Sequence, residues 1–201
     1  MSISRLPCKA LLFDLGGVLV KLTGVPRMME LTRHRFTVAG LWERWIASPA
    51  IRAFESGTMS VDEFGPAIVK EFAIDLPAEQ YVKEFTVWPS CTFPGVEELL
   101  LTLKNEYILA SLSNTNVLHW KRVKEDMHLI HHFDYNFPSH ETGLLKPDRE
   151  TFLHVAEAMS LAPGDILFFD DNLINVEGAR NAGLNAAEVH GVDDIRSYLR
   201  L

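Results

Sequence analysis

Five short runs of apolar residues recur along the chain, and helical patterns lie between them. The strongest runs span 10–13, 107–112 and 166–169, and weaker ones span 133–137 and 185–189. Apolar residues occupy consecutive rather than alternate positions in these runs, so both faces of each predicted strand are expected to be covered. Strands of this kind that alternate with helices predict an α/β fold, a doubly wound parallel sheet with helices on both faces.

Three stretches after residue 94 repeat their apolar residues at helical spacing. Pro94 suits the first position of the first helix, because its missing N–H would have no partner there. Gly183 is expected just past the end of the third, where a left-handed residue commonly terminates a helix. The apolar positions are Val96, Leu99, Leu100 and Leu103, then Phe152, Val155, Ala156 and Met159, then Val176, Ala179 and Ala182.

Residues 22–89 carry helical patterns only. We therefore predict an α/β core domain made of residues 1–21 and 90–201, and a four-helix domain of residues 22–89 inserted after the first strand. A crossover between parallel strands needs only about a dozen residues, so a longer insertion here is a candidate lid. We call residues 22–89 the helical insert.

Local signals divide the helical insert. Ser48-Pro49 is predicted to close one helix, and Ser60 with Glu63 forms a candidate capping box that opens another. Pro66 is expected to kink that second helix or to delay its start. The aromatic residues Trp42, Trp45, Phe54 and Trp88 are interpreted mainly as core, with sugar contact as the alternative.

Composition limits the partners. Asp and Glu total 27 against 19 Lys and Arg, which gives a net charge of −8, and no basic stripe is present. Nucleic acid is therefore not expected as a partner, whereas a small phosphorylated metabolite is compatible. No run approaches 18 apolar residues, so no membrane association is expected.

Cys8 and Cys91 lie far apart, which favours a reduced cytoplasmic protein over one with a single disulfide. Monomer and homodimer remain open.

Carboxylates stand where two of the predicted strands end. Asp14 follows the first run, and Asp170 and Asp171 follow the run 166–169. In a doubly wound sheet the carboxyl ends of the strands share one edge, so the three side chains are expected to converge there. Because three clustered carboxylates repel one another, a Mg²⁺ ion among them is the simplest arrangement. Asp14 is then the candidate nucleophile toward phosphorus.

Two further elements suit a phosphate site. Ser113 and Asn114 end the run that begins at residue 107, and their hydroxyl and amide are possible donors to phosphoryl oxygens. Lys146 in Gly143-Leu-Leu-Lys-Pro147 offers a compact positive charge. The loop must aim Lys146 inward, and a cis Lys146–Pro147 bond is predicted for that reason.

Taken together, these motifs resemble the haloacid dehalogenase-like (HAD) hydrolase superfamily. They are Phe13-Asp-Leu-Gly-Gly-Val18, Leu112-Ser-Asn114, Gly143-x-x-Lys-Pro147 and Phe169-Asp-Asp-Asn172, in that family's order. Within the superfamily, the segments FDLGGVLV, LSNTN, KPDRETF and FFDDNLINVEGARNAG are similar to bacterial glucose-1-phosphatase-like sugar phosphatases. The helical insert is similar to the C1 cap of that group.

The resemblance implies roles for single residues. It implies that Asp14 forms an aspartyl-phosphate, that Ser113 and the Asn114 backbone hold the phosphoryl group, and that Lys146 stabilises both Asp14 and the phosphate. It assigns Mg²⁺ to Asp14, the Gly16 carbonyl and Asp171, with Asp170 either ligating or holding a metal-bound water, and it places Asn175 behind these ligands. The function implied is a Mg²⁺-dependent phosphatase, a phosphoric monoester hydrolase acting on a small metabolite, a sugar phosphate in particular.

Gly16 departs from the family's commonest pattern, which has Asp there as general acid and base. Such assistance is worth about 10²–10⁴ in rate. A glycine at this position is compatible with three situations: a substrate with a good leaving group, another group that supplies the proton, or an enzyme that turns over slowly. Two alternatives stay open: a 2-haloacid dehalogenase-type hydrolase, in which Asp14 would attack carbon without a metal, and a phosphate-binding protein that is catalytically impaired because Gly16 replaces the general acid and base.

Overall fold

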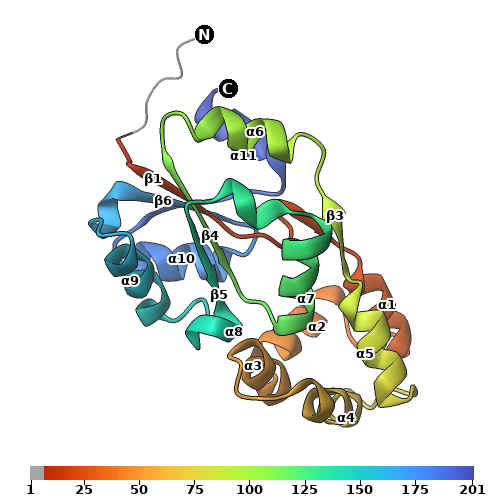
Figure 1. Ribbon diagram of the computed structural model, residues 1–201. Coiled ribbons are helices and arrows are strands. Elements are labelled where there is room, and N and C mark those ends of the chain that lie inside the picture. Colours follow the sequence, from red (N-terminus) through yellow and green to blue (C-terminus); the bar gives the residue numbers. More distant parts are fainter. Residues whose placement is uncertain (1–6) are drawn as a thin grey trace.

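A five-stranded parallel sheet forms the centre of the computed structural model, which describes residues 7–201 (Figure 1). Residues 1–6, the start of the predicted segment 1–21, lie outside the described residues. The strand order β5–β4–β1–β6–β7 places β1 in the middle, between β4 and β6. The strands are β1 (Ala10–Phe13), β4 (Ile108–Ser113), β5 (Tyr135–Pro138), β6 (Ile166–Asp170) and β7 (Asn185–Glu188). All five predicted strands are present, and the doubly wound α/β fold is confirmed.

Helices cover both faces of this sheet. Alternate residues of β1 point to opposite sides, so Leu11 and Phe13 join one apolar cluster and Ala10 and Leu12 join another. The first cluster includes α6 (Val96–Leu103) and α11 (Val192–Leu199), and the second includes α9 (Arg149–Ala158) and α10 (Leu173–Asn181). Figure 1 shows these two pairs of helices on opposite sides of the strands.

Shorter elements complete the core. They are α7 (Val117–Lys121), the π-helix η1 (Arg122–Asp126), the 3₁₀ helices η2 (Leu129–His132) and η3 (Pro163–Asp165), and α8 (Ser139–Thr142). Gly183 follows α10 with a φ of +97°, as predicted. The prediction for Pro94 was wrong: the left-handed Gly95, with φ of +82°, precedes the helix, which begins at Val96, so Pro94 lies in the turn.

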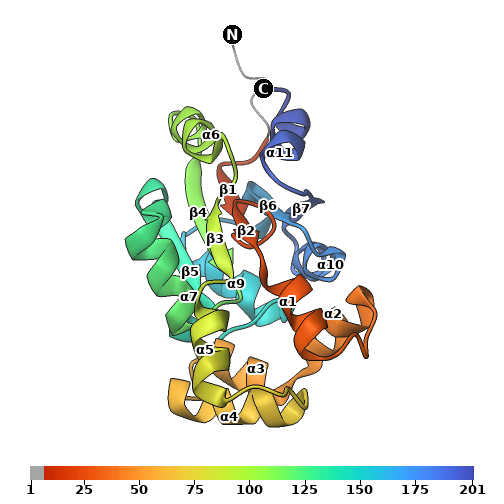
Figure 2. The ribbon, with the colours of Figure 1, turned by 90° about the vertical axis from the view of Figure 1, so that its right-hand side faces the viewer.

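The helical insert contains five helices, one more than predicted. They are α1 (Gly24–Leu31), α2 (Val38–Ala47), α3 (Pro49–Glu55), α4 (Val61–Glu71) and α5 (Ala78–Thr86). Ser48-Pro49 ends α2 as predicted, but Ser48 also caps α3 through its side chain, so a further helix begins at the same point. These helices lie together beside one end of the sheet (Figure 2) and share an apolar cluster of their own.

The capping box of Ser60 and Glu63 forms as predicted, and α4 starts directly after it. Pro66 therefore does not delay the start of the helix and lies inside it. Pro66 is exposed, and its ring occupies the water-facing side of α4.

A two-stranded antiparallel ribbon joins the helical insert to the core. It pairs β2 (Val20–Leu22) with β3 (Pro89–Thr92). At its base a Cβ on Gly24 would lie 2.2 Å from the Trp88 ring, so only glycine permits this approach. Cys8 and Cys91 are both free thiols. Within residues 7–201 no helix combines the length and apolar character needed to cross a bilayer.

Candidate active site

The carboxyl ends of three neighbouring strands place the predicted site residues at one edge of the sheet. Phe13, the last residue of β1, lies opposite Phe169 of β6 and opposite Ser111 of β4. Asp14 and Asp170 each follow these paired positions, so the parallel register brings them side by side. Asp14, Asp170 and Asp171 each offer a carboxylate oxygen, and these oxygens lie within 4.8 Å of one another.

Lys146 lies between two of these carboxylates. Its Nζ is 2.8 Å from Oδ1 of Asp14 and 2.7 Å from Oδ2 of Asp170. The Lys146 side chain is buried, as are both partners, so water screens these contacts little. The Lys146–Pro147 bond is cis, as predicted.

The side-chain amide of Asn114 is engaged in hydrogen bonds with the backbone of Lys146. Its Nδ2 donates to the Lys146 carbonyl and its Oδ1 accepts from the Lys146 N–H, each at 2.9 Å. The prediction that the side-chain amide is available to phosphate therefore needs revision, because the amide holds the lysine loop instead. Ser113, at the end of β4, lines the same cavity as Asp14.

Asp170 accepts hydrogen bonds at both oxygens besides its contact with Lys146. The Asn172 N–H donates to Oδ1 at 2.8 Å, and Asn175 Nδ2 lies 3.0 and 3.1 Å from the two oxygens. Asn175 thus contacts the Asp170 carboxylate directly. Asp170 is fully buried and has little remaining capacity to accept bonds.

Burial and crowding perturb the acidity of the cluster. Burial raises the pKa of Asp14 to about 7, and repulsion by Asp170 and Asp171 adds to this while Lys146 opposes it. Burial likewise raises the pKa of Asp171 to about 6, with Asp170 contributing in the same direction. Burial lowers the pKa of Lys146, but Asp14 and Asp170 outweigh it and hold that pKa above its ordinary value. Lys146 therefore stays charged at neutral pH.

Two glycines after β1 behave differently. Gly17 has a φ of +77°, and a Cβ there would lie 1.9 Å from Oδ2 of Asp171, so its bare backbone makes room for that carboxylate. A Cβ on Gly16 would come closest to the tip of Leu22, at 2.9 Å. Leu22 is exposed, so a side chain at position 16 requires only that this flexible tip move.

The donor set suits a divalent cation. Three carboxylates face one lysine, which leaves negative charge unbalanced when all are ionised. Carboxylate and backbone carbonyl oxygens are the ligands that Mg²⁺ prefers, and Gly17 provides the space in which Asp171 can reach inward. The residues present therefore fit a magnesium ion.

A cavity of about 750 Å³ opens above the carboxylates, within the usual range for small-molecule sites. At one end it is lined by Asp14, Ser113, Lys146 and other predicted site residues, and elsewhere by apolar side chains of the helical insert. Trp42, Trp45 and Trp88 line it, whereas Phe54 stacks on Phe64 inside the insert, with ring centroids 4.1 Å apart.

Three residues that the sequence analysis did not single out belong to this region. Glu55 of α3 and His119 of α7 line the cavity. Buried Ser139 joins the helical insert to the core, because its Oγ lies 2.6 Å from the Glu55 carbonyl and accepts from the Thr115 N–H at 2.9 Å. Nothing in the sequence separates Glu55 from the other acidic residues of the insert, since only the folded chain brings it to the cavity.

The family comparison agrees with this geometry. Residues 8–183 match the family model of haloacid dehalogenase-like hydrolases. The chain belongs to the haloacid dehalogenase-like hydrolase family. It is therefore an enzyme of the hydrolase class, and the predicted resemblance to the HAD superfamily is confirmed, while the sugar-phosphatase subgroup stays a prediction.

Two curated relatives share parts of this hydrolase sequence. Drimenol cyclase drtB from Aspergillus calidoustus is 39% identical over 67 residues, which cover 33% of this chain but only 13% of the cyclase. Sesquiterpene phosphatase astK from Aspergillus oryzae is 25% identical over 196 residues, which cover 96% of this chain and 94% of the phosphatase.

Solved structures of the HAD family enzyme bt-2542 from Bacteroides thetaiotaomicron are similar over nearly the whole chain. The magnesium complex has a TM-score of 0.79 at 26% identity and covers 98% of this chain and all of its own. The complex with magnesium and inorganic phosphate has a TM-score of 0.74 at 27% identity and covers 90% of this chain and 93% of its own.

Proposed function

We propose that this hydrolase is a Mg²⁺-dependent phosphatase that cleaves a small organic phosphate monoester through an aspartyl-phosphate on Asp14. The observation that carries the proposal is the convergence of Asp14, Asp170 and Asp171 around Lys146 at the end of a cavity. Two similarities support it: astK is named a phosphatase, and bt-2542 was solved with magnesium and inorganic phosphate.

Asp14, Asp171 and the Gly16 carbonyl are the proposed ligands of the ion. Asp170 acts mainly through its hydrogen bonds, because Lys146, Asn172 and Asn175 already occupy its oxygens. When bound, Mg²⁺ would withdraw negative charge from the phosphoryl oxygens and balance the carboxylates.

The protein's own groups perform the remaining steps. Lys146 contacts Oδ1 of Asp14, so the other carboxylate oxygen is the one proposed to attack phosphorus. The Ser113 hydroxyl and the Asn114 N–H are proposed to donate to the phosphoryl oxygens, and the Lys146 ammonium offsets their charge. Water then attacks the aspartyl-phosphate and releases phosphate.

The residues that line the cavity indicate which organic group the substrate carries. The resemblance implies a sugar phosphate, and three tryptophans on the wall offer faces on which a sugar ring could stack. The wall also contains Leu41, Met28 and Ile51, which favour an apolar group over a hydroxylated one. A terpenoid monophosphate accords with both this wall and the name of astK.

A metabolite panel tests the proposal. Purified protein is assayed on p-nitrophenyl phosphate, sugar 1-phosphates and prenyl monophosphates, each with Mg²⁺ and with EDTA. The proposal predicts turnover that needs Mg²⁺ and is lost in Asp14→Asn. Turnover that EDTA or Asp14→Asn leaves intact would contradict it, as would chloride release from chloroacetate in EDTA without any phosphatase activity. Equal rates on sugar and prenyl phosphates would contradict only the preference for an apolar group.

A further inference from the structure

An alcohol departs from phosphorus easily only when a proton reaches its oxygen, and Gly16 has no proton to give. The cavity contains few other candidates. Asp14 and Asp171 are assigned to the nucleophile and the ion, and Lys146 is held by two carboxylates. Among the described residues that line the cavity, this leaves Glu43, Glu55 and His119 as the remaining carboxyl and imidazole side chains.

His119 does not have a free ring nitrogen. Its Nε2 lies 2.8 Å from the Phe85 carbonyl, and its Nδ1 lies 3.3 Å from Nδ2 of Asn116. Burial lowers the pKa of His119 to about 4, so the ring is neutral at pH 7 and its single proton is directed to Phe85. Glu43 lies on the exposed side of α2, where water competes with a substrate for its carboxylate.

Glu55 is held in the cavity from two directions. Its backbone carbonyl accepts from Ser139 Oγ, and Ser139 Oγ accepts from the Thr115 N–H, two residues beyond Ser113, the proposed phosphate donor. Its carboxylate accepts from the Trp45 indole. The last residue of α3 is therefore tied both to the end of β4 and to the wall of the cavity.

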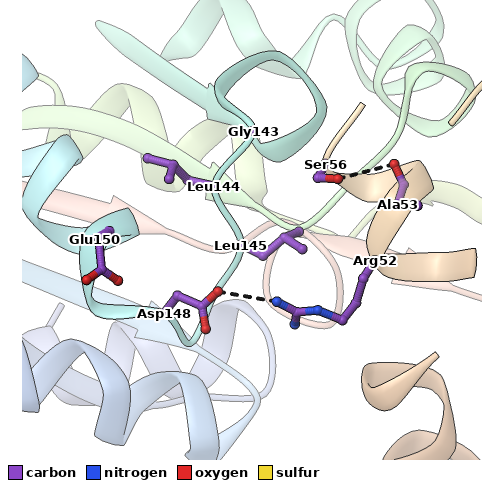
Figure 3. Close-up of a pocket in the computed structure, with 8 residues that line it drawn as sticks. All are labelled: Arg52, Ala53, Ser56, Gly143, Leu144, Leu145, Asp148 and Glu150. Atoms are coloured by element: carbon purple, nitrogen blue, oxygen red, sulfur yellow. Dashed lines mark hydrogen bonds and ion pairs between the residues drawn. The ribbon is translucent and has the colours of Figure 1, made fainter. Parts of the chain in front are cut away.

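The surroundings of α3 fix this position against the core. Arg52 reaches across to Asp148, with the two charged atoms 3.3 Å apart (Figure 3). Just beyond the helix, Gly57 has a φ of +73°, and a Cβ there would lie 2.3 Å from the His140 carbonyl. The close approach of α3 to α8 thus depends on a glycine two residues after Glu55.

The charges that face Glu55 are Lys146 from the core loop and Arg52 from its own helix, and both favour its ionised form. The Trp45 hydrogen bond acts in the same direction. Burial outweighs all three and raises the pKa of Glu55 to about 7. Near neutral pH both the acid and the carboxylate are populated, as a group that must give and regain a proton requires.

We infer that Glu55 is the general acid and base of this hydrolase, supplied by the helical insert in place of the side chain that Gly16 lacks; the inference rests on the proposed phosphatase function. In the first step the bond between Asp14 and phosphorus forms, the bond from phosphorus to the alcohol oxygen breaks, and the proton of Glu55 passes to that oxygen. In the second step the Glu55 carboxylate takes a proton from the attacking water as the bond between Asp14 and phosphorus breaks. Glu55 ends protonated and Asp14 ends free.

The test compares leaving groups in Glu55→Gln, which keeps an acceptor for the Trp45 indole. We expect kcat for n-butyl phosphate, whose alcohol leaves poorly, to fall by about 10²-fold. With p-nitrophenyl phosphate, whose phenolate needs no proton, we expect a stoichiometric burst followed by slow turnover, because only the second step lacks its base. The decline of kcat/KM for n-butyl phosphate above about pH 7 in the wild type should disappear, and Glu55→Asp should restore part of the rate.

The matched control is Glu79→Gln, which removes one exposed carboxylate from α5 of the same insert. It should leave both rates unchanged. If Glu55→Gln slows both substrates equally without a burst, or leaves both unchanged, the inference is overturned. Failure of the proposed function would give a different result: the wild-type protein would show no Mg²⁺-dependent hydrolysis of p-nitrophenyl phosphate. That result would overturn both the proposed function and this inference.

Discussion

Asn114 and Lys146 are joined by a reciprocal pair of hydrogen bonds, each 2.9 Å long, between the side-chain amide of Asn114 and the backbone N–H and carbonyl of Lys146. The two residues are separated by 32 positions in the sequence. The pair fixes the lysine loop to the end of β4, so the proposed phosphate donors and the ammonium keep a set distance. Asn114 is thus a positioning residue, in addition to its proposed role as a backbone N–H donor to phosphate.

Asn114→Ala should remove both bonds and let the lysine loop shift. We expect the free energy of unfolding to fall by about 1–3 kcal/mol, since each lost bond contributes about 1 kcal/mol. Turnover of p-nitrophenyl phosphate should fall more than about tenfold, because misplacement of a catalytic group is costly. Urea titration and steady-state assays measure the two. Asn185→Ala, which removes one exposed bond to Gly164, is the control and should keep full activity. Full activity in Asn114→Ala would contradict the positioning role.

Lys146→Met should leave Asp14 and Asp170 buried without their counter-charge. Breaking a buried ion pair costs about 3–5 kcal/mol, and we expect a loss of this size at pH 8. The pKa of Asp14 lies above that of an unfolded Asp, so the folded state binds more protons and gains stability as pH falls from about 7 toward 4. Without Lys146, which opposes the rise, the pKa of Asp14 should lie higher still, so the variant should gain more stability than the wild type as pH falls, and its deficit should shrink at low pH.

Lys9→Met offers a comparison for Lys146→Met. Its ion pair with Asp165 is also 2.8 Å long but lies on the surface, so the change should cost less than about 1 kcal/mol at any pH. Chemical unfolding at a series of pH values measures both variants. Equal losses of unfolding free energy in the two variants would show that burial does not determine how much the ion pairs of Lys146 contribute to stability.

Magnesium should stabilise the protein more strongly as pH rises. The pKa values of Asp14 and Asp171 are raised to about 7 and about 6, so protons occupy these ligands at pH 5 and the ion must displace them. The increase in Tm on adding Mg²⁺ should grow between pH 5 and pH 8. Asp171→Asn should largely lose this increase while raising Tm in EDTA, because it removes repulsion within the cluster. A pH-independent increase would contradict the proposed ligand set.

Adjacent glycines should respond oppositely to the same substitution. Gly16→Asp meets only the flexible tip of Leu22, so the protein should fold and should recover hydrolysis of n-butyl phosphate in a Glu55→Gln background. Gly17→Asp would collide with Asp171 at a left-handed position, and it should lose Mg²⁺ stabilisation. Melting curves, together with rates on n-butyl phosphate and p-nitrophenyl phosphate, distinguish the two variants. A Gly16→Asp variant with no gain on n-butyl phosphate would argue against a shortage of proton donors at that position.

The sequence predicted the residues whose placement follows from topology. Asp14 and Asp170 end apolar runs of parallel strands, and the rule that such ends share an edge brings them together without further information. Lys146 could be placed only through the family resemblance, because a lysine in a loop has no intrinsic position.

Other features depend on tertiary contacts that no local pattern encodes. Glu55 reaches the cavity because Ser139 and Gly57 hold α3 against α8, and these contacts join residues more than 80 positions apart. The ribbon of β2 and β3 escaped prediction because strands of three and four residues leave almost no periodicity. Pro94 was misplaced because a left-handed glycine can precede a helix as well as follow it.

Chemical trapping of Asp14 during turnover tests the central claim most directly. Wild-type protein is quenched while hydrolysing p-nitrophenyl phosphate with Mg²⁺, treated with borohydride and mapped by peptide mass spectrometry. An aspartyl-phosphate predicts reduction of Asp14 to homoserine, in Mg²⁺ but not in EDTA, with no such product in Asp14→Asn. Sustained turnover by Asp14→Asn, or trapping at another carboxylate, would contradict the account.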